Sequence, residues 1–387
     1  MRLLFMTDFS EQFPYRLLRG VMRYSRESGE RWAVCRMPPS FLRANGLPAV
    51  VRYAVEWKAD VVIGAFEPED NLELFRREGI VVLALDNVSL FPDVPNITAD
   101  YHRMGLLAAR RFEARGFREF GFVGIRGLCW SDGRLEGFRE YLEKAGYAGH
   151  IHFYTREHWD SQWSYRPERL QAWLRALPKP VGLMACDDTR ASFVVETCHS
   201  LGLRIPEEVA IIGVDNDEIQ CEMSIPSISS IDVDLERGGY ELAEMVSEMV
   251  RDPSNKGHDI LLRPLDIVTR ESSNIITTKD QLVHQALTII HSNLDRKISV
   301  PDILKEVPIS RRGLEERFYK ATGTSIYRYI IYQRVNHFAG LLLSSKESIA
   351  NLAARMDEAD PKSLSRRFKE LKGCTPSAYR KKNLRKL

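Results

Sequence analysis

The stretch DPKSLSRRFKELKGCTPSAYR, residues 360–380, repeats the pattern of ISRRGLEERFYKATGTSIYRYI, residues 309–330, about fifty positions later. Two copies are too few for a solenoid, because stacked repeats need at least three units to bury a continuous core. The repeat therefore indicates a duplicated functional module. Five residues of the first copy recur as the same residue type fifty positions on, and they are Leu314, Arg317, Phe318, Gly323 and Tyr329.

Each copy carries the start and stop signals of a short helix. Ser310 and Asp360 suit N-cap positions, and Pro361 suits a first turn. Gly323 and Gly373 suit the position that follows the last turn. Apolar residues three, four or seven positions apart predict one buried face on each helix. These residues are Leu314 and Phe318 in the first copy, and Leu364, Phe368 and Leu371 in the second.

The opposite face of each predicted helix is polar. A second short apolar segment precedes each helix, SVPDILKEV at 299–307 and SIANLAARM at 348–356, and a tight connection joins the two. Helix, turn and polar-faced helix is the layout of a DNA-reading helix-turn-helix. The side chains expected to face DNA are Arg311, Arg312, Glu315 and Glu316 in the first copy, and Lys362, Ser363, Arg366 and Lys369 in the second.

Charge is distributed unevenly along the chain. Residues 279–387 contain 22 Lys+Arg and 11 Asp+Glu, a net charge of +11, whereas residues 1–278 contain 33 and 42, a net charge of −9. A basic tail suits a phosphate backbone, which the acidic remainder would repel. The alternative is an ordinary helical bundle with a solvated basic face, and the charge separation argues against it. Phosphate contacts or a loose tail are expected of Lys381, Lys382, Arg385 and Lys386.

The two copies together resemble the double helix-turn-helix domain of AraC-type transcription regulators, over about the last hundred residues. The most specific element is RFKELKGCTPSAYR, residues 367–380, which has its Gly, Thr-Pro and Tyr-Arg at the family's spacing. The chain departs from the family in the turns, where Pro308 and the pair Asp357 and Glu358 stand in place of the usual Gly. Asp tolerates a left-handed backbone better than most residues, so we expect the second turn to keep its shape.

Residues 1 to about 272 alternate short apolar runs with helical patterns. Such alternation predicts parallel sheets covered by helices. The runs divide near NITADYHRMGLLAARRFEARGF, residues 96–117, into two halves of comparable size, which predicts a two-lobed α/β fold with a ligand cleft. The candidate strands are RLLFMTD (2–8), VVIGAF (61–66), VVLALD (81–86), FGFVGI (120–125), HIHFYT (150–155), GLMACDD (182–188) and VAIIGVD (209–215).

Polar side chains follow several of these runs where the strand is expected to end. Open parallel sheets bind small molecules at the carboxyl ends of their strands. Convergent carboxylates and Arg suit a sugar, whose hydroxyls donate and accept hydrogen bonds, while an aromatic ring covers its apolar carbons. For each Asp, a simple N-cap role on the following helix is the alternative. The candidate ligand residues are Asp8, Asp86, Trp130, Arg134, Asp187, Asp188 and Asp215.

The stretch HSLGLRIPEEVAIIGVDNDEI, residues 199–219, resembles the sensor domain of the lactose/galactose repressor family and the related periplasmic sugar-binding proteins. SDGRLEGFREYL, residues 131–142, is similar to that family's effector-contacting segment. The resemblance implies that Arg134 and Asp215 contact the ligand, with Asp187 or Asp188 beside them. It also matches Asp100 with a strand-end Asp of the family, in a structural or a ligand-facing role. Those repressors begin with a small DNA-binding headpiece, whereas this sequence opens on the expected first strand of the sensor.

A sensor of this kind followed by an AraC-type tail is an uncommon order, and over its full length the chain resembles the family of bacterial xylose operon regulators. The fold class expected is an α/β two-lobed periplasmic-binding-protein-like sensor with parallel sheets in residues 1–272, a linker in 273–281, and an all-α double helix-turn-helix domain in 282–387. The resemblance implies a homodimeric transcription activator that responds to xylose or a related pentose. Its expected partners are double-stranded operator DNA, the sugar effector and RNA polymerase.

Composition and motifs argue against other classes of protein. The hydrophobic content of 44% supports a sizeable core. No stretch approaches a membrane span or a signal peptide, which predicts a cytoplasmic protein. The six cysteines form no C-x-x-C pair, and no phosphate loop, metal-ligand spacing or nucleophile elbow is present, so we expect no metal, cofactor or enzymatic activity. The rival interpretations are a sugar-binding adaptor whose basic tail binds protein, and a sugar-processing enzyme that uses the cleft carboxylates.

Overall fold

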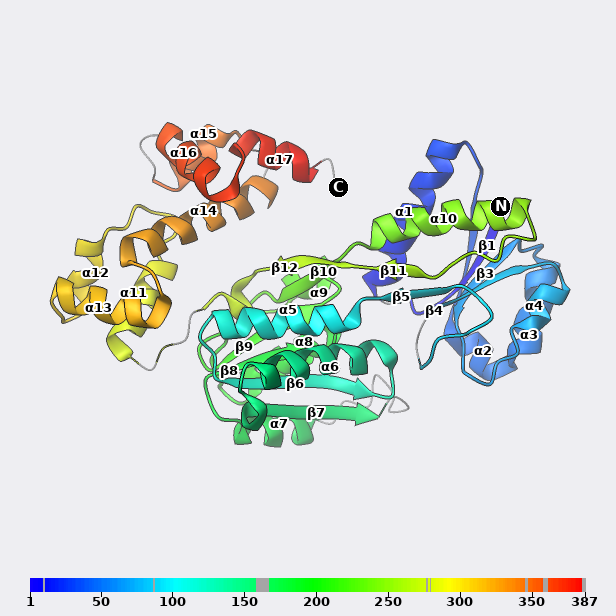
Figure 1. Cartoon of the computed structure of the whole chain (residues 1–387), viewed down its shortest axis with the longest axis horizontal. Helices are drawn as coiled ribbons and strands as arrows, with labels where there is room; N and C mark the ends of the chain where they lie inside the picture. The colour runs from blue at the N-terminus through cyan, green and yellow to red at the C-terminus, as the bar shows by residue number, and fades with distance from the viewer. Residues whose placement is uncertain are drawn as a thin grey trace. The chain divides into compact units, whose positions relative to one another are not determined.

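The computed structural model describes residues 1–9, 11–85, 88–157, 167–275, 278, 280–344, 347–357 and 361–384. The chain forms two compact units, Met1–Ile275 and Ile276–Leu387 (Figure 1). The domain limits expected from the sequence, with a linker over 273–281, stay a prediction. Five residues named above lie outside the described residues, and they are Asp86, Glu358, Asp360, Arg385 and Lys386.

The first unit contains two six-stranded sheets. The first has the order β11-β5-β4-β3-β1-β2 with parallel neighbours, and the second has the order β12-β10-β9-β8-β6-β7, in which β10 and β12 are antiparallel. The chain passes between the sheets after β5, after β10 and between β11 and β12 (Figure 1). The strands are β1 (Arg2–Met6), β2 (Ala33–Met37), β3 (Val61–Ala65), β4 (Val81–Leu85), β5 (Asn96–Ala99), β6 (Glu119–Arg126), β7 (Ile151–Glu157), β8 (Val181–Ala185), β9 (Val209–Val214), β10 (Ser229–Val233), β11 (Ile260–Leu262) and β12 (Pro264–Val268).

All seven strands that the sequence predicts are present, and the division near residues 96–117 is confirmed. Long apolar runs mark the inner strands, because helices cover both faces of a parallel sheet. Every residue of β8 and β9 is buried, for example. Strands β2, β5, β10, β11 and β12 are not predicted. They are short or mix polar with apolar residues, and all five lie at or next to a sheet edge, with β2, β11 and β12 at three of the four edges.

Two pairs of helices in this unit cross with their backbones in contact. A Cβ atom on Gly105 or Gly137 would lie 1.9 Å from a backbone oxygen of the opposite helix, so α5 and α6 approach only because both residues lack one. Gly20 and Gly239 join α1 to α10 in the same way. The helices are α1 (Gln12–Ser28), α2 (Pro39–Asn45), α3 (Leu47–Glu56), α4 (Glu73–Arg77), α5 (Tyr101–Ala114), α6 (Cys129–Lys144), α7 (Pro167–Ala176), α8 (Asp188–Ser200), α9 (Glu218–Met223) and α10 (Leu235–Arg251), with short 3₁₀ turns η1 (Ala148–His150) and η2 (Glu271–Ser273).

The second unit is helical and has two small cores that share one long helix. Helix α14 contributes Ile326, Tyr329 and Ile330 to the first core, and Val335 and Phe338 to the second. The two reading helices and the helices before them are confirmed, whereas α11, α14 and α17 are not predicted. The helices are α11 (Gln281–His291), α12 (Val300–Glu306), α13 (Arg311–Thr322), α14 (Ile326–Ser344), α15 (Ile349–Arg355), α16 (Pro361–Lys372) and α17 (Pro376–Leu384).

The sequence repeat is also a repeat in three dimensions. Helices α13 and α16 begin fifty residues apart, and so do α14 and α17. The rings of Phe318 and Tyr329 meet edge to face with centroids 5.4 Å apart, and those of Phe368 and Tyr379 do so at 5.3 Å. The shared aromatic residues therefore fix the same angle between reading helix and following helix in both copies.

The caps and turn residues predicted for the two reading helices have the expected conformations where the structure describes them, but one residue of the predicted buried face is exposed. The Ser310 hydroxyl accepts the N–H of Gly313 at 3.2 Å, and Gly323 and Gly373 both have φ of 72°. Asp357 is left-handed with φ of 51°, as expected of the turn before α16. The placement of Leu371 on the buried face is wrong. It lies in the last turn of α16 and is 45% exposed, so the buried face of that helix ends at Phe368.

We expect Phe368→Ala to lower the free energy of unfolding of the second copy by about 3–5 kcal/mol, because Phe368 is fully buried between Phe338 and Tyr379. Leu371→Ala on the same helix should change it by less than about 0.5 kcal/mol. Hydrogen exchange of the α16 amides in the full-length protein measures both effects. Equal loss of protection in the two variants would contradict the packing described.

Candidate ligand cleft and nucleic-acid interface

Arg134 is the centre of the candidate ligand site in the first unit. Its side chain is 5% exposed, and Nη2 lies 3.3 Å from Oδ1 of Asp215 while Nη1 donates to the backbone oxygen of Cys186. The guanidinium lies over the rings of Tyr101 and Trp130, at 5.3 and 5.4 Å from their centroids. The structure thus brings together three of the predicted ligand residues, Trp130, Arg134 and Asp215.

The glycine crossing of α5 and α6 places Tyr101 beside Arg134. Tyr101 is the first residue of α5, and its Cβ lies 3.0 Å from the position that a Cβ on Gly133 would take. Larger residues at the crossing would force the helices apart and remove one aromatic face from the guanidinium. Tyr101 is absent from the predicted set, although it directly follows the strand-end Asp100.

Asp187 caps α8 and binds an arginine of the same helix. Its Oδ1 accepts the N–H of Arg190 at 2.7 Å, and its Oδ2 accepts from the Arg190 side chain at 2.9 Å. The N-cap alternative therefore describes Asp187, and it also describes Asp100, which accepts the N–H of Arg103 at 3.1 Å. The sequence prediction does not include Arg190, and its only local signal is the spacing Asp-x-x-Arg after an apolar run.

Asp188 is buried behind these groups. Its Oδ1 accepts from the Ser230 hydroxyl at 2.6 Å, and its Oδ2 accepts the N–H of Asp217 at 2.8 Å. Burial raises the pKa of Asp188 well above its usual value, although the bond from Ser230 acts in the opposite direction. Asp188 thereby ties the end of β8 to the turn that follows β9.

That turn, residues 215–217, has an unusual backbone. Asp215 has φ of 95° and Asn216 has φ of 50°, a conformation that costs non-glycine residues about 1–3 kcal/mol. The N–H of Asn216 donates to the Ser230 hydroxyl at 3.0 Å, and Arg16 donates to the backbone oxygen of Asp215 at 2.8 Å. Burial raises the pKa of Asp215, against the lowering effect of Arg134. The surrounding bonds hold a strained turn that presents the Asp215 carboxylate to Arg134.

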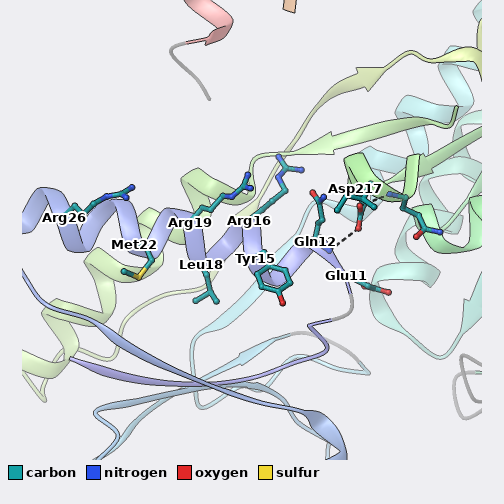
Figure 2. Close-up of a pocket in the computed structure, with 11 residues that line it drawn as sticks. Glu11, Gln12, Tyr15, Arg16, Leu18, Arg19, Met22, Arg26 and Asp217 are labelled. Atoms are coloured by element: carbon teal, nitrogen blue, oxygen red, sulfur yellow. Dashed lines mark hydrogen bonds between the residues drawn. The ribbon is translucent and has the colours of Figure 1, made fainter. Parts of the chain in front are cut away.

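Helix α1 reaches from the first lobe to the second. Arg16 donates to the backbone oxygen of Val233 at 3.0 Å and pairs with Asp232 at 2.9 Å. The N–H of Gln12 donates to Oδ2 of Asp217 at 3.2 Å, the dashed bond in Figure 2. These bonds fasten the start of α1 to the end of β10 and to the turn that carries Asp215.

Glu11, at the start of α1, adds a further acid to the site. Burial and the negative charges of Asp187 and Asp215 raise its pKa to about 8, while Arg190 acts in the opposite direction and the predicted ligand residue Asp8 adds to the rise. The acids of the two lobes are thus close enough to affect one another's charge. Glu11 is not predicted from the sequence, where it lies in a polar stretch without a local signal.

A hollow of about 600 Å³ runs along α1 and reaches α9 (Figure 2), and it borders the candidate site, because Glu11, Arg16 and Asp217 line it as well. Its lining includes Arg19, Met22 and Arg26 of α1, and Ile219 and Gln220 of α9. Arg134, Asp187 and Asp188 do not line it. We place the ligand site at the buried Arg134 cluster, because convergent buried polar groups define such sites better than an open volume does.

Of the predicted DNA-facing residues of α13, Arg312 and Glu316 lie on the side of the helix away from Phe318. Arg311 and Glu316 are exposed, and Arg312 is 91% exposed with its Nε 3.1 Å from Glu316 Oε1. Glu315 is half-buried and accepts the N–H of Ile326 at 3.3 Å, so it also supports the start of α14. The exposed polar side chains nearest the start of the helix are available to a partner.

The matching face of α16 is more basic. Lys362, Arg366 and Lys369 are exposed, and Ser363 is half-buried. Arg366 stands at the repeat position of Glu316, so the second reading face lacks the acid that pairs with Arg312 in the first. The two faces are therefore equivalent in position and different in charge.

The described residues meet the requirements neither of a membrane-spanning helix nor of a metal site. No described helix is long and apolar enough to cross a membrane. Across the same residues, no group of three or more His, Cys, Asp or Glu side chains is arranged to hold a metal ion. All six cysteines are free thiols.

We expect Glu11→Gln to stabilise the sensor more at high pH than at low pH. A raised pKa means that the folded protein keeps a proton that the unfolded chain releases, so this group reduces stability as pH rises from about 4.5 to about 8. Thermal unfolding at pH 5.5 and 8.5 measures the effect, with the exposed Glu69→Gln as control. A difference from the wild type that does not grow with pH would contradict the raised pKa of the half-buried Glu11.

Two known families match separate parts of the chain. Residues 109–273 match the periplasmic binding protein-like domain, and residues 303–382 match the helix-turn-helix domain. The xylose operon regulatory protein of Escherichia coli is 24% identical over 99% of this chain and 97% of its own length. That of Haemophilus influenzae is 26% identical over 76% of this chain and 77% of its own length.

Solved structures agree on the fold. The structure of the xylose-binding transcription activator xylR has 23% identity and a TM-score of 0.65, and the match covers 98% of this chain and 97% of that one. A LacI family regulator from Enterococcus faecium with bound ribose has 18% identity and a TM-score of 0.59 over 72% of this chain and all of that one. The predicted fold class is confirmed. Along nearly its whole length the chain is similar to xylose operon regulatory proteins, and it contains a match to the periplasmic binding protein-like domain followed by a match to the helix-turn-helix domain.

Proposed function

We propose that this protein is a sugar-responsive, DNA-binding transcription regulator that activates genes for the use of xylose or a related pentose. The observation that carries the proposal is the combination of a two-lobed sensor, with the Arg134–Asp215 ion pair at the carboxyl ends of the strands of its second sheet, and a duplicated helix-turn-helix. Similarity to xylose operon regulatory proteins along both parts supports the choice of sugar. The protein acts in the cytoplasm and performs no catalysis of its own.

The sugar binds between the lobes, against Arg134 and Asp215. Arg134 donates and Asp215 accepts, so the pair serves both roles of a sugar hydroxyl. Asp187 and Arg190 bind each other at 2.9 Å and lie beside this pair, where they order the wall of the site. Asp8 and Glu11 extend from the first lobe, and Trp130 supplies an aromatic surface.

Sugar binding changes the relative populations of lobe arrangements. A ligand shifts such an equilibrium only through contacts that differ between the states. Contacts from Asp8 and Glu11 on one lobe and Arg134 and Asp215 on the other exist together only when the lobes approach. In a homodimer, this change alters the presentation of two DNA-binding units, and the bound activator contacts RNA polymerase.

Each copy of the helix-turn-helix reads one segment of the operator. Two reading helices suit successive major-groove segments, about 34 Å apart. Arg312 and Arg366 are proposed as base contacts, because Arg pairs with guanine through two hydrogen bonds. Arg311, Glu316, Lys362, Ser363 and Lys369 complete the two faces, with Glu315 beside them.

We expect Asp215→Asn to abolish sugar binding, because the substitution removes the charge that the buried Arg134 requires and leaves that group without its ion pair. The exposed Asp93→Asn should bind as the wild type does. Calorimetric titration with xylose, arabinose, ribose and glucose identifies the sugar and tests the variant. Wild-type affinity in a folded Asp215→Asn protein would remove Asp215 from the site.

We expect Arg312→Ala and Arg366→Ala to relax base preference in two different parts of one DNA site, since each lies on a different reading helix. Each loss should amount to about 1–3 kcal/mol of discrimination. The exposed Lys381→Ala should instead weaken binding to all sequences alike and reduce the salt slope by about one.

Selection of binding sites from randomised DNA with each full-length variant measures these effects. If both Arg variants selected the wild-type site unchanged, the two side chains would be solvated surface. A wild-type protein that bound no DNA in a salt-dependent manner would favour the adaptor interpretation.

A further inference from the structure

The turn at residues 215–217 has a second set of bonds, on the side away from Arg134. The amide oxygen of Asn216 accepts a hydrogen bond from Nη2 of Arg270 at 2.9 Å. Nη1 of Arg270 donates to the backbone oxygen of Ile228 at 3.0 Å, so the guanidinium bridges the turn and the residue before β10. The residue next to the ligand carboxylate of Asp215 is therefore bound to a residue near the end of the sensor.

The backbone of Arg270 is fixed as firmly as its side chain. Its N–H donates to the Ser229 hydroxyl at 2.8 Å, and the same hydroxyl donates to its carbonyl oxygen at 3.0 Å. These two bonds fix the position of Arg270 relative to β10, so Arg270 cannot shift along the strand when the turn at residues 215–217 moves. A displacement of Asn216 must either carry the segment around Arg270 with it or break the bond.

The segment after Arg270 is held to the same strands and then leads out of the sensor. The Ser272 hydroxyl donates to the backbone oxygen of Ile211 at 2.7 Å and accepts the N–H of Ser229 at 2.9 Å. Ser272 is fully buried, and the first unit ends at Ile275. Five residues of chain therefore separate the guanidinium that holds Asn216 from the end of the sensor.

We propose that Arg270 is a positioning residue that couples the ligand site to the chain leading into the DNA-binding unit, through its bond to Asn216. The proposal rests on the proposed function. Sugar at the Asp215 carboxylate changes the orientation of the left-handed turn, and the Asn216 amide moves with it. The bond to Arg270 then has different strength in the two states, and this difference is what a coupling between two sites requires.

The residue types fit this role better than a purely structural one. Both Asp215 and Asn216 have positive φ, which glycine adopts without strain, yet each has a side chain that binds an arginine. One arginine lies in the ligand site and the other at the exit segment. A turn that only reversed the chain would need neither bond.

The test compares four full-length proteins: wild type, Asn216→Gly, Arg270→Ala and the double variant. Asn216→Gly keeps the left-handed backbone accessible and removes only the amide. The exposed Arg263→Ala is the matched control, since it removes an arginine near the end of the same domain. Calorimetry with d-xylose gives sugar affinity, and fluorescence anisotropy gives affinity for the duplex selected by the wild type, with and without saturating d-xylose.

We expect the fold-change in DNA affinity caused by d-xylose to fall by at least about threefold in Asn216→Gly and Arg270→Ala, and to remain at the wild-type value in Arg263→Ala. The double variant should lose no more than either single variant, because both remove the same bond. Sugar affinity without DNA should stay within about threefold of the wild type. A merely structural role would lower the melting temperature and leave the fold-change unaltered.

One result would contradict the coupling through Arg270, and another would contradict the proposed function on which it rests. Wild-type fold-changes in both folded single variants would remove Arg270 from the coupling and leave the proposed function intact. A wild-type protein whose DNA affinity does not respond to any pentose tested would overturn the proposed function itself. If Arg270→Ala failed to fold, Asn216→Gly would decide the question alone.

Discussion

The sensor depends on keeping one guanidinium charged in a place almost without water. A buried charge is costly unless it is paired and hydrogen-bonded. Arg134 meets this condition at its two terminal nitrogens, through Asp215 and the backbone oxygen of Cys186, and its guanidinium lies over the faces of Tyr101 and Trp130. Its Nε has no hydrogen-bond partner among the described residues. Each of these groups comes from a different strand end or helix start, so the position of Arg134 requires the second sheet, the helix crossing at Gly105 and the turn after β9 to be correct together. The same requirement leaves the site polar and ordered before a ligand arrives, which lowers the entropic cost of binding.

The second unit consists of two copies of a small helical module, and each copy must have a core of its own. Each copy alone has a core of modest size, with Leu314 and Phe318 in one and Leu364 and Phe368 in the other. Helix α14 serves both cores, because its early residues pack in the first and its later residues in the second. The most family-specific stretch of the sequence also has a structural use here. Arg380 donates to the backbone oxygens of Leu342 and Glu347, at the end of α14 and just beyond it, so the Tyr-Arg pair secures the C-terminal end of the shared helix.

The sequence predicts those features that depend on local pattern. Buried inner strands such as Val209–Val214 are continuous apolar runs, and the reading helices have caps and a buried face within a dozen residues. Edge strands such as Ala33–Met37 have a mixed composition and acquire their identity only by pairing with a neighbour. The same limit applies to the site. The sequence predicts Arg134 and Asp215 as candidate ligand residues because each lies after a recognisable run, whereas Arg16, Arg190 and Glu11 join the candidate site only when α1 and α8 are placed in space.

The turn after β9 is held by contacts from three parts of the sensor, which are the neighbouring strands, helix α1 and the segment around Arg270. Asp188 and Ser230 hold it from the neighbouring strands, Arg16 and Gln12 from α1, and Arg270 from the exit segment. A conformation that costs about 1–3 kcal/mol at each left-handed residue persists only where its surroundings impose it. Each of these contacts contributes to holding the turn in that conformation. The Asp215 carboxylate pairs with Arg134 and the Asn216 amide binds Arg270, so this one turn joins the buried Arg134 cluster to the segment at the end of the sensor.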